Sequence, residues 1–454
     1  MAVAQQGLEK ARMNRVAFAS LAGTTIEWYD FYIYGTAAAL VFPRLFFPGL
    51  GTAAALVASF ATFGVAFVAR PLGAIVFGHY GDRIGRKRTL VFSLLLMGGG
   101  TLVIGLLPTA DTIGVAAPLV LVLIRLCQGL AVGGEWAGAA LLTAENAPAT
   151  KRGRYGMYPQ LGPAIALVLS SATFLATNLT LSAEQFLAWG WRVPFLVSIL
   201  LIVVGLWIRV TIGETKSFQQ VRKNNHVVRL PFADVFRQQS REVFLVAGAL
   251  TILFASFYLG VSYLTAFGTG VLGLSSSTVL TANIVAGLVF AAATILSAIW
   301  SDRVGRRRLI IAGNLFSTVW AVVVFQIIGS VGAVGYGLAL SVTMIGVGVV
   351  YGPVGSYVPE LFAARHRYTG AGVAYSLAGI LGGSIPPIVA AVLAAEFGTA
   401  SVGFYLAAMG VLSLVCVYFL SETRATELDR DEARRNDLVT ARAERRTSAG
   451  GEAR

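Results

Sequence analysis

An eight-residue motif occurs twice in this chain of 454 residues, and each copy lies between two long apolar stretches. The first copy reads Gly-Asp-Arg-Ile-Gly-Arg-Lys-Arg at positions 81–88, and the second reads Ser-Asp-Arg-Val-Gly-Arg-Arg-Arg at positions 301–308. Their separation is close to half the length of the chain. Such a repeat predicts two structurally equivalent halves in the same orientation, which is one known architecture of membrane transporters.

The composition is that of a membrane protein, because 56% of the residues are apolar, only 13% are charged, and the mean hydropathy is +0.74. About 20 apolar residues in a helix cross a hydrocarbon layer of ~30 Å. Twelve stretches of about this length occur, at 16–42, 52–77, 89–107, 115–141, 155–178, 192–212, 243–268, 277–300, 309–329, 332–358, 369–395 and 400–420. Only helices satisfy their own backbone in lipid without closing a barrel. We therefore predict an all-α membrane protein with twelve transmembrane helices in two six-helix bundles related as parallel repeats.

Basic residues alternate with the expected spans, as short cytoplasmic loops collect Lys and Arg. Most of the 35 basic residues fall in the two tails and in the loops after even-numbered spans. This pattern predicts a multi-pass protein of the cell membrane with both termini in the cytoplasm. The net charge of +13 then reflects topology and attraction to anionic lipid. The bilayer is the expected partner, nucleic acid is not, and a monomer is expected.

The polar segments divide the chain into five regions. We predict a cytoplasmic N-tail at 1–15, a six-helix bundle at 16–212, a cytoplasmic linker at 213–242, a second bundle at 243–420 and a charged cytoplasmic tail at 421–454. The linker is the longest polar interruption. The first apolar stretch is too long for a signal peptide and contains two acids, so we expect it to be retained.

The sequence offers little for enzyme chemistry. Its three histidines, His79, His226 and His366, lie in probable loops, and no metal-binding or nucleophile motif accompanies them. Cys127 and Cys416 lie within apolar stretches, where small packing residues are common. We expect no enzymatic activity, no cofactor and no metal.

Ionisable residues inside the apolar stretches are the candidate functional groups, because a charge in hydrocarbon is costly unless it faces partners or water. Glu27, Asp30 and Tyr34 are spaced by three and four residues, so they share one face of the first expected helix. Arg125, Gln128 and Glu135 form a second polar stripe in the fourth.

The first and fourth expected helices supply a buried acid and a buried base that should attract each other. A carboxylate that loses its cationic partner becomes easier to protonate, so Asp30 and Arg125 could act as a proton switch. A permanent ion pair that joins the two helices is the structural alternative. Glu27 and Glu135 could equally lie near helix ends and hydrogen-bond to the neighbouring backbone. Arg70 could anchor an interface, pack between helices or contact a ligand.

Three motifs resemble those of the major facilitator superfamily. They are the paired Asp-Arg-x-Gly-Arg-basic loops, the stretch from Arg125 to Trp136 with its Gly-Gly-Glu-Trp ending, and the two-half arrangement of spans. Within that superfamily, Glu27-Trp-Tyr-Asp-Phe31 and Arg367-Tyr-Thr-Gly370 are similar to the metabolite:proton symporter family. The resemblance covers residues 14–424.

This resemblance implies a proton-driven importer of a small organic solute, in a class that includes proline and betaine, oxoglutarate, citrate and shikimate carriers. It implies Asp30 as proton acceptor with Arg125 as its partner. Glu27 and Glu135, as acids in the apolar stretches, are further coupling candidates. The resemblance also implies a conformational latch at the repeated motif. The latch residues would be Gly78, Asp82, Arg83, Gly85, Arg86 and Lys87 in the first half, and Asp302, Arg303, Gly305 and Arg306 in the second.

The lining of the substrate site is the least determined feature. Aromatic rings could surround a quaternary ammonium, and an arginine could hold a carboxylate, so zwitterions and carboxylates both remain open. Our candidates for substrate binding are Tyr29, Tyr34, Gln128, Tyr263, Asn283 and Tyr351. A proton-coupled efflux antiporter or a facilitator on the same fold is the main alternative function, and a non-transporting membrane sensor is a more distant one.

Overall fold

The computed structural model describes residues 2–84, 86–133, 135–211, 231–328, 332–363 and 366–424, and it describes no side chains at 2–16 or 78–88. Residues up to 211 are called the first half below, and residues from 231 the second half. The first half contains α1 (Ala2–Leu40), α2 (Phe42–Leu45), α3 (Thr52–Ile84), α4 (Arg86–Leu106), α5 (Ala110–Ile113), α6 (Ala116–Val132), α7 (Glu135–Asn146), η1 (Ala149–Lys151), α8 (Arg152–Thr180), α9 (Ala183–Ala188), η2 (Gly190–Arg192) and α10 (Val193–Thr211).

The second half is also helical throughout its regular structure. It contains α12 (Pro231–Gln238), α13 (Ser240–Ala249), α14 (Thr251–Tyr258), η3 (Leu259–Tyr263), α15 (Leu264–Gly270), α16 (Ser276–Val304), α17 (Arg306–Ile327), α18 (Gly332–Glu360), α19 (Arg367–Gly379), η4 (Ile380–Ser384), α20 (Ile385–Phe397) and α21 (Thr399–Tyr418). The described residues include no β-strand. The predicted all-α fold class is confirmed.

Each of the twelve apolar stretches coincides with helical structure. Among the described residues, ten helices are long and apolar enough to cross a membrane, and several are composite, such as the α13–α15 run over Ser240–Gly270. The third expected span corresponds to the shorter apolar helix Val91–Leu106, and the first corresponds to the C-terminal part of α1. The helix α1 begins at Ala2, inside the expected N-tail, and α12 lies inside the expected linker.

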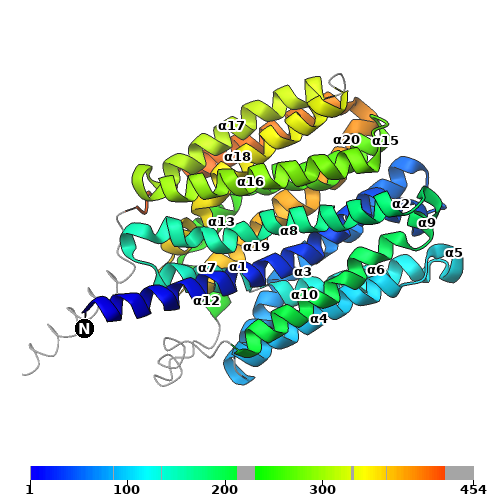
Figure 1. The fold of residues 1–454 in the computed structure, drawn as a ribbon. Coiled ribbons are helices and arrows are strands. Elements are labelled where there is room, and N and C mark those ends of the chain that lie inside the picture. The colour runs from blue at the N-terminus through cyan, green and yellow to red at the C-terminus, as the bar shows by residue number, and fades with distance from the viewer. Residues whose placement is uncertain are drawn as a thin grey trace, which may run out of the picture.

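The two halves lie side by side and meet along a few long helices. Figure 1 shows α16, α17 and α18 together on one side of the molecule and α3, α4, α6 and α10 on the other. Between them, α8 packs against both α1 and α16, while α3 packs against α19, η4 and α20. Contacts between the halves therefore run through α1, α3, α7 and α8 of the first half.

The repeated motif occupies equivalent places in the two halves. The first copy spans the junction of α3 and α4, and the second spans the junction of α16 and α17. In both copies a helix of about thirty residues ends just before the glycine position, and the next helix begins directly after it. Position 85 itself lies outside the described residues. The parallel repeat predicted from the motif is therefore visible in the order of the helices.

Two π-helical segments interrupt the spans that face the interface between the halves. They are η3, between α14 and α15, which is wholly buried, and η4, between α19 and α20, whose last three residues are buried. A π-turn widens the helix locally and is frequent at functional sites. Large apolar side chains such as Trp207 and Val334 are instead exposed on the outer surface, as expected for a surface that meets lipid.

Candidate functional site

A cavity lies at the centre of the molecule, between the two halves. Its volume is about 20 Å³, so an organic solute could enter only if the halves moved apart. It is lined by Trp28 and Tyr32 of α1, Pro163 of α8, Leu253, Phe254 and Phe257 of α14, Phe290 of α16, and Val347 and Tyr351 of α18. Because both halves supply its walls, a relative movement of the halves would change its shape and its access. This position makes it the leading candidate for a solute site.

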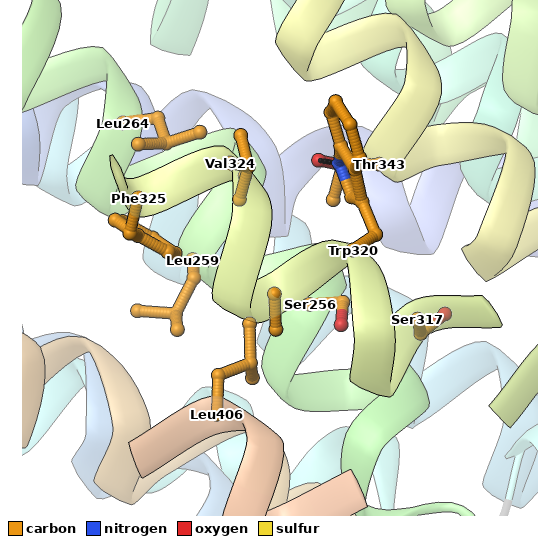
Figure 2. A pocket seen from close by; sticks show the side chains of 11 residues that line it. Ser256, Leu259, Leu264, Ser317, Trp320, Val324, Phe325, Thr343 and Leu406 are labelled. Carbon is orange, nitrogen blue, oxygen red and sulfur yellow. Dashed lines mark hydrogen bonds between the residues drawn. The ribbon is translucent and has the colours of Figure 1, made fainter. Parts of the chain in front are cut away.

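A second cavity of about 10 Å³ lies wholly within the second half, among α14, η3, α15, α17, α18 and α21. Figure 2 shows Trp320 and Thr343 at one side of it, and the Trp320 Nε1–H donates to Thr343 Oγ1 at 2.9 Å. Its lining contains no charged residue. We therefore assign no functional role to this cavity.

Several polar atoms around the central cavity have no hydrogen-bond partner. They are Trp28 Nε1, Tyr32 Oη and Tyr258 Oη. The rings themselves are well packed, since the Trp28 centroid is 5.5 Å from that of Tyr32 and 6.5 Å from that of Tyr258. Buried polar groups are nearly always satisfied in native proteins. A polar solute in the cavity would supply the missing partners.

A hydrogen-bonded cluster joins the halves beside this cavity. Tyr351 Oη lies 3.0 Å from Tyr375 Oη, and the Tyr375 ring stacks on Trp136 with the centroids 3.7 Å apart and the planes at 7°. Trp136 Nε1 donates to Gln160 Oε1 at 2.9 Å, and Gln160 Nε2 donates to the Tyr351 carbonyl at 3.1 Å. Trp136 and Gln160 belong to the first half, so the cluster crosses the interface.

The first half contains the predicted acid and base, both buried. Neither carboxylate oxygen of Asp30 has a hydrogen-bond partner. Arg125 Nη1 instead donates to Gln128 Oε1 at 3.0 Å, and the Arg125 guanidinium lies 4.0 Å from the Tyr34 ring centroid. The permanent ion pair between Asp30 and Arg125, our structural alternative, is therefore not formed here.

The position of Arg125 is fixed by a chain of contacts to α4. Gln128 Nε2 donates to the Met97 carbonyl at 3.1 Å and to Thr101 Oγ1 at 2.9 Å, which orients its Oε1 toward Arg125. Asp30 lies near the charge of Arg125 and the hydroxyl of Thr101. The acid and the base are thus neighbours, but the base is bound to an amide and the acid is not bound.

Arg70 of α3 is a second buried cation in the same region. It is 3% exposed, and its Nε and Nη2 have no hydrogen-bond partner. Its guanidinium carbon lies 4.3 Å from the Phe31 ring centroid and 4.6 Å from that of Phe67. Arg125 approaches the same Phe31 ring at 4.6 Å. Sequence analysis left the role of Arg70 open, because the absence of a partner is visible only in three dimensions.

The two other predicted coupling acids lie in different surroundings. Glu27 is 2% exposed and lies one turn before Asp30 on α1. Glu135 is half-buried and is the first residue of α7, where a carboxylate is favoured by the helix dipole.

Of the six predicted substrate-binding residues, the structure places Tyr351 in the wall of the central cavity. Tyr29 donates to the Pro194 carbonyl at 3.1 Å within the first half, and Tyr34 Oη lies 2.6 Å from Thr62 Oγ1 beneath Arg125. Gln128 accepts a hydrogen bond from Arg125, as described above. Neither Tyr263, packed near Phe267 and Phe325, nor Asn283, which donates to Thr265 Oγ1 at 3.0 Å, lines the cavity.

Some residues around the cavity were not singled out as binding residues. Trp28, Tyr32 and Tyr258 were not among our candidates for substrate binding, and Trp136 was named only as the end of a motif. Gln160 gave no signal at all. Aromatic side chains are so common in such spans that only their packing separates the lining residues from the others.

At one end of the molecule, the second motif copy connects the halves. Asp302 Oδ1 accepts from the Gly153 backbone N–H at 2.8 Å, and Oδ2 accepts from that of Arg154 at 3.0 Å, so this aspartate caps α8 of the other half. Arg306 pairs with Glu360 at 2.8 Å and with Asp302 at 3.5 Å. We call these contacts the Asp302 cluster.

The remaining latch candidates are less informative. Gly305 adopts φ of +110° between α16 and α17, and Arg303 is exposed. Of the first copy, Gly78, Asp82, Arg83, Arg86 and Lys87 lie outside the described side chains, and Gly85 lies outside the described residues.

The halves also touch on the other side of the cavity. Ser384 Oγ of η4 donates to the Gly64 carbonyl of α3 at 3.1 Å. An added Cβ at Gly35, one turn beyond Tyr32 toward the end of α1, would lie 3.0 Å from Ser262 Oγ of η3. Contacts between the halves therefore bound the central cavity on both sides.

The described residues include no group of three or more His, Cys, Asp or Glu that could hold a metal.

Comparison with known sequences gives consistent matches over most of the chain. The family model described as Major Facilitator Superfamily matches residues 21–385 and 287–449. The inner membrane metabolite transport protein YhjE of Escherichia coli K12 is 43% identical, over 91% of this chain and 96% of its own. The shikimate transporter of the same organism is 36% identical over 92% and 96%, and its proline/betaine transporter is 28% identical over 92% and 85%.

Comparison with solved structures identifies the same fold. The proton:xylose symporter XylE bound to 6-bromo-6-deoxy-D-glucose superposes with a TM-score of 0.72 at 18% identity, covering 94% of this chain and 99% of that one. The partially occluded inward-open xylose transporter XylE from E. coli also gives 0.72, at 17% identity and over 91% and 99%. At this level of identity the likeness concerns the fold alone.

Proposed function

This chain belongs to the major facilitator superfamily, and from that premise we propose that it imports a small organic solute together with protons. Family membership makes it a multi-pass membrane transporter of a small molecule and not an enzyme. The proton coupling, the direction and the chemical class of the solute are the parts that we propose. The curated relatives include carriers of shikimate and of proline or betaine.

One observation supports proton coupling above the others. Asp30 is a buried acid whose two oxygens have no hydrogen-bond partner, and its neighbouring cation is bound elsewhere. A buried unpaired carboxylate is costly. It can be stabilised either by a proton or by movement of Arg125 from Gln128 to Asp30. These two alternatives make Asp30 a site that exchanges a proton when the surrounding helices move.

The central cavity is the proposed solute site, and rocking of the two halves is the proposed motion. Contacts on both sides of the cavity join the halves, so release of one set while the other persists would open the cavity to one side of the membrane at a time. We assign the Asp302 cluster to the cytoplasmic side, with both termini there, because basic residues gather at that end. The two bundles that we propose to move relative to each other are residues 16–212 and 243–420.

The energy available from protons is sufficient for uptake. One proton that crosses ~100 mV contributes about 2.3 kcal/mol, which is roughly a fiftyfold accumulation of a neutral solute. A pH gradient adds to this. Coupling of one proton to each solute would therefore suffice for concentrative import of a neutral solute. A monoanion that enters with one proton moves no net charge, so the pH gradient alone would drive its uptake.

Replacement of Asp30 tests the proposal. In proteoliposomes with an imposed pH gradient, we expect Asp30→Asn to abolish the accumulation of radiolabelled solute while the exchange of internal for external solute persists. Shikimate, proline and glycine betaine are suitable first solutes. Asp111→Asn provides a matched control, because Asp111 is exposed on the short helix α5.

Three outcomes would contradict the proposal. Unchanged accumulation by Asp30→Asn would place the coupling group elsewhere. Wild-type transport that survives or reverses when the inward proton gradient collapses would favour a facilitator or an efflux antiporter. Absence of transport for every solute, together with solute binding, would favour a sensor.

A further inference from the structure

We propose that Arg70 binds the carboxylate of the transported solute, so that the cargo is an organic anion. This inference rests on the proposed transport function and names the chemical class of its solute. It depends on the burial of Arg70, on its unpartnered donors, and on its position between the two halves.

The guanidinium of Arg70 has N–H donors without acceptors. A guanidinium has five N–H donors in a fixed planar fork and no acceptor. In Arg70 both Nε and Nη2 lack a hydrogen-bond partner, although the residue is only 3% exposed. Buried charged groups are normally paired and hydrogen-bonded, because an unpaired one is strongly destabilising. Among the described residues, no carboxylate forms an ion pair with this buried cation.

The surroundings of Arg70 hold the side chain but do not satisfy it. Its guanidinium carbon lies 4.3 Å from the ring centroid of Phe31, 4.6 Å from that of Phe67 and 5.6 Å from that of Trp28. Aromatic faces attract a cation and offset part of its burial, but they offer no oxygen. A carboxylate matches the free edge of the fork, since it accepts two parallel N–H bonds.

The position of Arg70 connects it to the cavity and to the second half. Trp28 both lines the cavity and lies against Arg70. A Cβ added at Gly379 of α19 would lie 4.0 Å from Arg70 Nη1, so the guanidinium reaches the second half. Tyr32 and Tyr258, whose phenol oxygens lack partners, lie within electrostatic range of Arg70. One carboxylate could meet the guanidinium and a phenol together.

The charges in this region favour the joint entry of a proton and an anion. Glu27 and Asp30 of α1, Arg70 of α3 and Arg125 of α6 are each at most 3% exposed. With both acids ionised, these four side chains have no net charge. A proton on Asp30 leaves one positive charge, and one carboxylate cancels it. Proton and anion together therefore avoid a net charge in the membrane interior.

Pairs of compounds that differ only in the carboxylate test the inference on the purified full-length protein. We choose shikimate with methyl shikimate and oxoglutarate with dimethyl oxoglutarate, and we follow binding by the fluorescence of the tryptophans near the cavity. We expect the anion of at least one pair to bind at least about tenfold more tightly than its methyl ester. Equal affinities within both pairs would overturn the proposal.

Variants assign the effect to Arg70. We expect Arg70→Gln to weaken carboxylate binding roughly 10- to 100-fold and Arg70→Lys to weaken it less, because lysine keeps the charge but loses the fork. Arg44→Gln is the matched control, since Arg44 is exposed. Unchanged carboxylate affinity in folded Arg70→Gln would also overturn the proposal.

A second variant protects the test against misfolding of Arg70→Gln. Tyr258→Phe removes an unpartnered hydroxyl and keeps the ring, so we expect normal folding and about 3- to 10-fold weaker carboxylate binding. An unaltered affinity here, with no preference for carboxylates in the wild type, would reject the inference without Arg70→Gln.

The failure of this inference differs from the failure of the proposed function. Proton-driven accumulation of a neutral solute, unaffected by Arg70→Gln, would reject the carboxylate site and leave proton symport in place. Carboxylate binding that depends on Arg70, without any dependence of uptake on the proton gradient, would reject proton symport and leave the site in place.

Discussion

The amide of Gln128 determines which group neutralises Arg125. Its Oε1 accepts from Arg125 Nη1 at 3.0 Å, and its own Nε2 is held by α4 at Met97 and Thr101. This arrangement keeps Arg125 away from Asp30 although the two are neighbours. We therefore propose Gln128 as a positioning residue for the proton site, while its role in substrate binding stays a prediction.

Replacement of Gln128 by leucine should close the gap between the acid and the base. Without the amide, Arg125 loses an acceptor that contributes about 1.5–3 kcal/mol, and Asp30 becomes its nearest anion. We expect Gln128→Leu to reduce gradient-driven accumulation at least about tenfold, while solute binding by tryptophan fluorescence changes little. An accumulation equal to that of the wild type would show that the position of Arg125 does not matter for coupling.

The candidate site was only partly predictable at this scale. Asp30 and Arg125 were identified because ionisable residues are rare in apolar stretches. The hydrogen-bond partners of Arg125 were not identified, because the position of the Gln128 amide depends on how α4 and α6 pack. Arg70 was noticed, but its missing hydrogen bonds are a property of the whole fold. Trp136 stacks on Tyr375 across more than two hundred residues, which no local pattern indicates.

Helix ends are the element-scale feature with the clearest physical cause. α16 ends at Val304 and α17 begins at Arg306, so the chain reverses at the single residue Gly305. Its φ of +110° is accessible to glycine and strained for other residues. Glu422, just beyond α21, accepts from the backbone N–H of Arg306 at 2.9 Å and of Arg307 at 3.1 Å. Glu422, at the start of the C-terminal tail, thus stabilises the junction between α16 and α17.

Gly305→Ala should therefore destabilise this junction. The new Cβ would meet the strained φ and lie 2.5 Å from Glu422 Oε2. We expect a loss of about 1–3 kcal/mol in stability, seen as a lower melting temperature in detergent. Gly99→Ala in α4 is the matched control, because nothing lies within 4 Å of its Cβ and it should be neutral or slightly stabilising. Equal melting temperatures for both variants would refute the strain at Gly305.

Elements were more predictable than side-chain contacts. All twelve apolar stretches lie on helices, because the length and hydrophobicity of a span are local properties of the sequence. The π segments η3 and η4 were not expected, since an extra residue in a helical turn leaves no mark in hydropathy. The early start of α1 and the helix α12 were missed for a different reason, because polar helices lack the apolar signal on which the expectation relied.

At the scale of the whole molecule, function depends on the balance between the contacts on the two sides of the central cavity. On one side, Asp302 caps α8 of the other half, and Arg306 and Arg152 approach Glu360 at 2.8 and 4.0 Å. On the other side, Ser384 and Gly64 join the halves through a neutral hydrogen bond. Hydrogen bonds to charged groups are about twice as strong as neutral ones. The Asp302 cluster should therefore be the stronger of the two closures.

Removal of Asp302 should shift this balance. Asp302→Ala deletes the acceptor of two backbone N–H groups of α8, each worth about 1.5–3 kcal/mol, so the equilibrium constant for closure at this end should fall by more than tenfold. Spin labels at the exposed positions Thr150 and Val304, with Cys127 and Cys416 replaced by serine, report the separation of the halves there. We expect longer distances than in the labelled parent, and Asp111→Ala should leave them unchanged. If the distances stay the same while accumulation is lost, Asp302 acts on transport by a route other than closure of this end, and the latch interpretation fails.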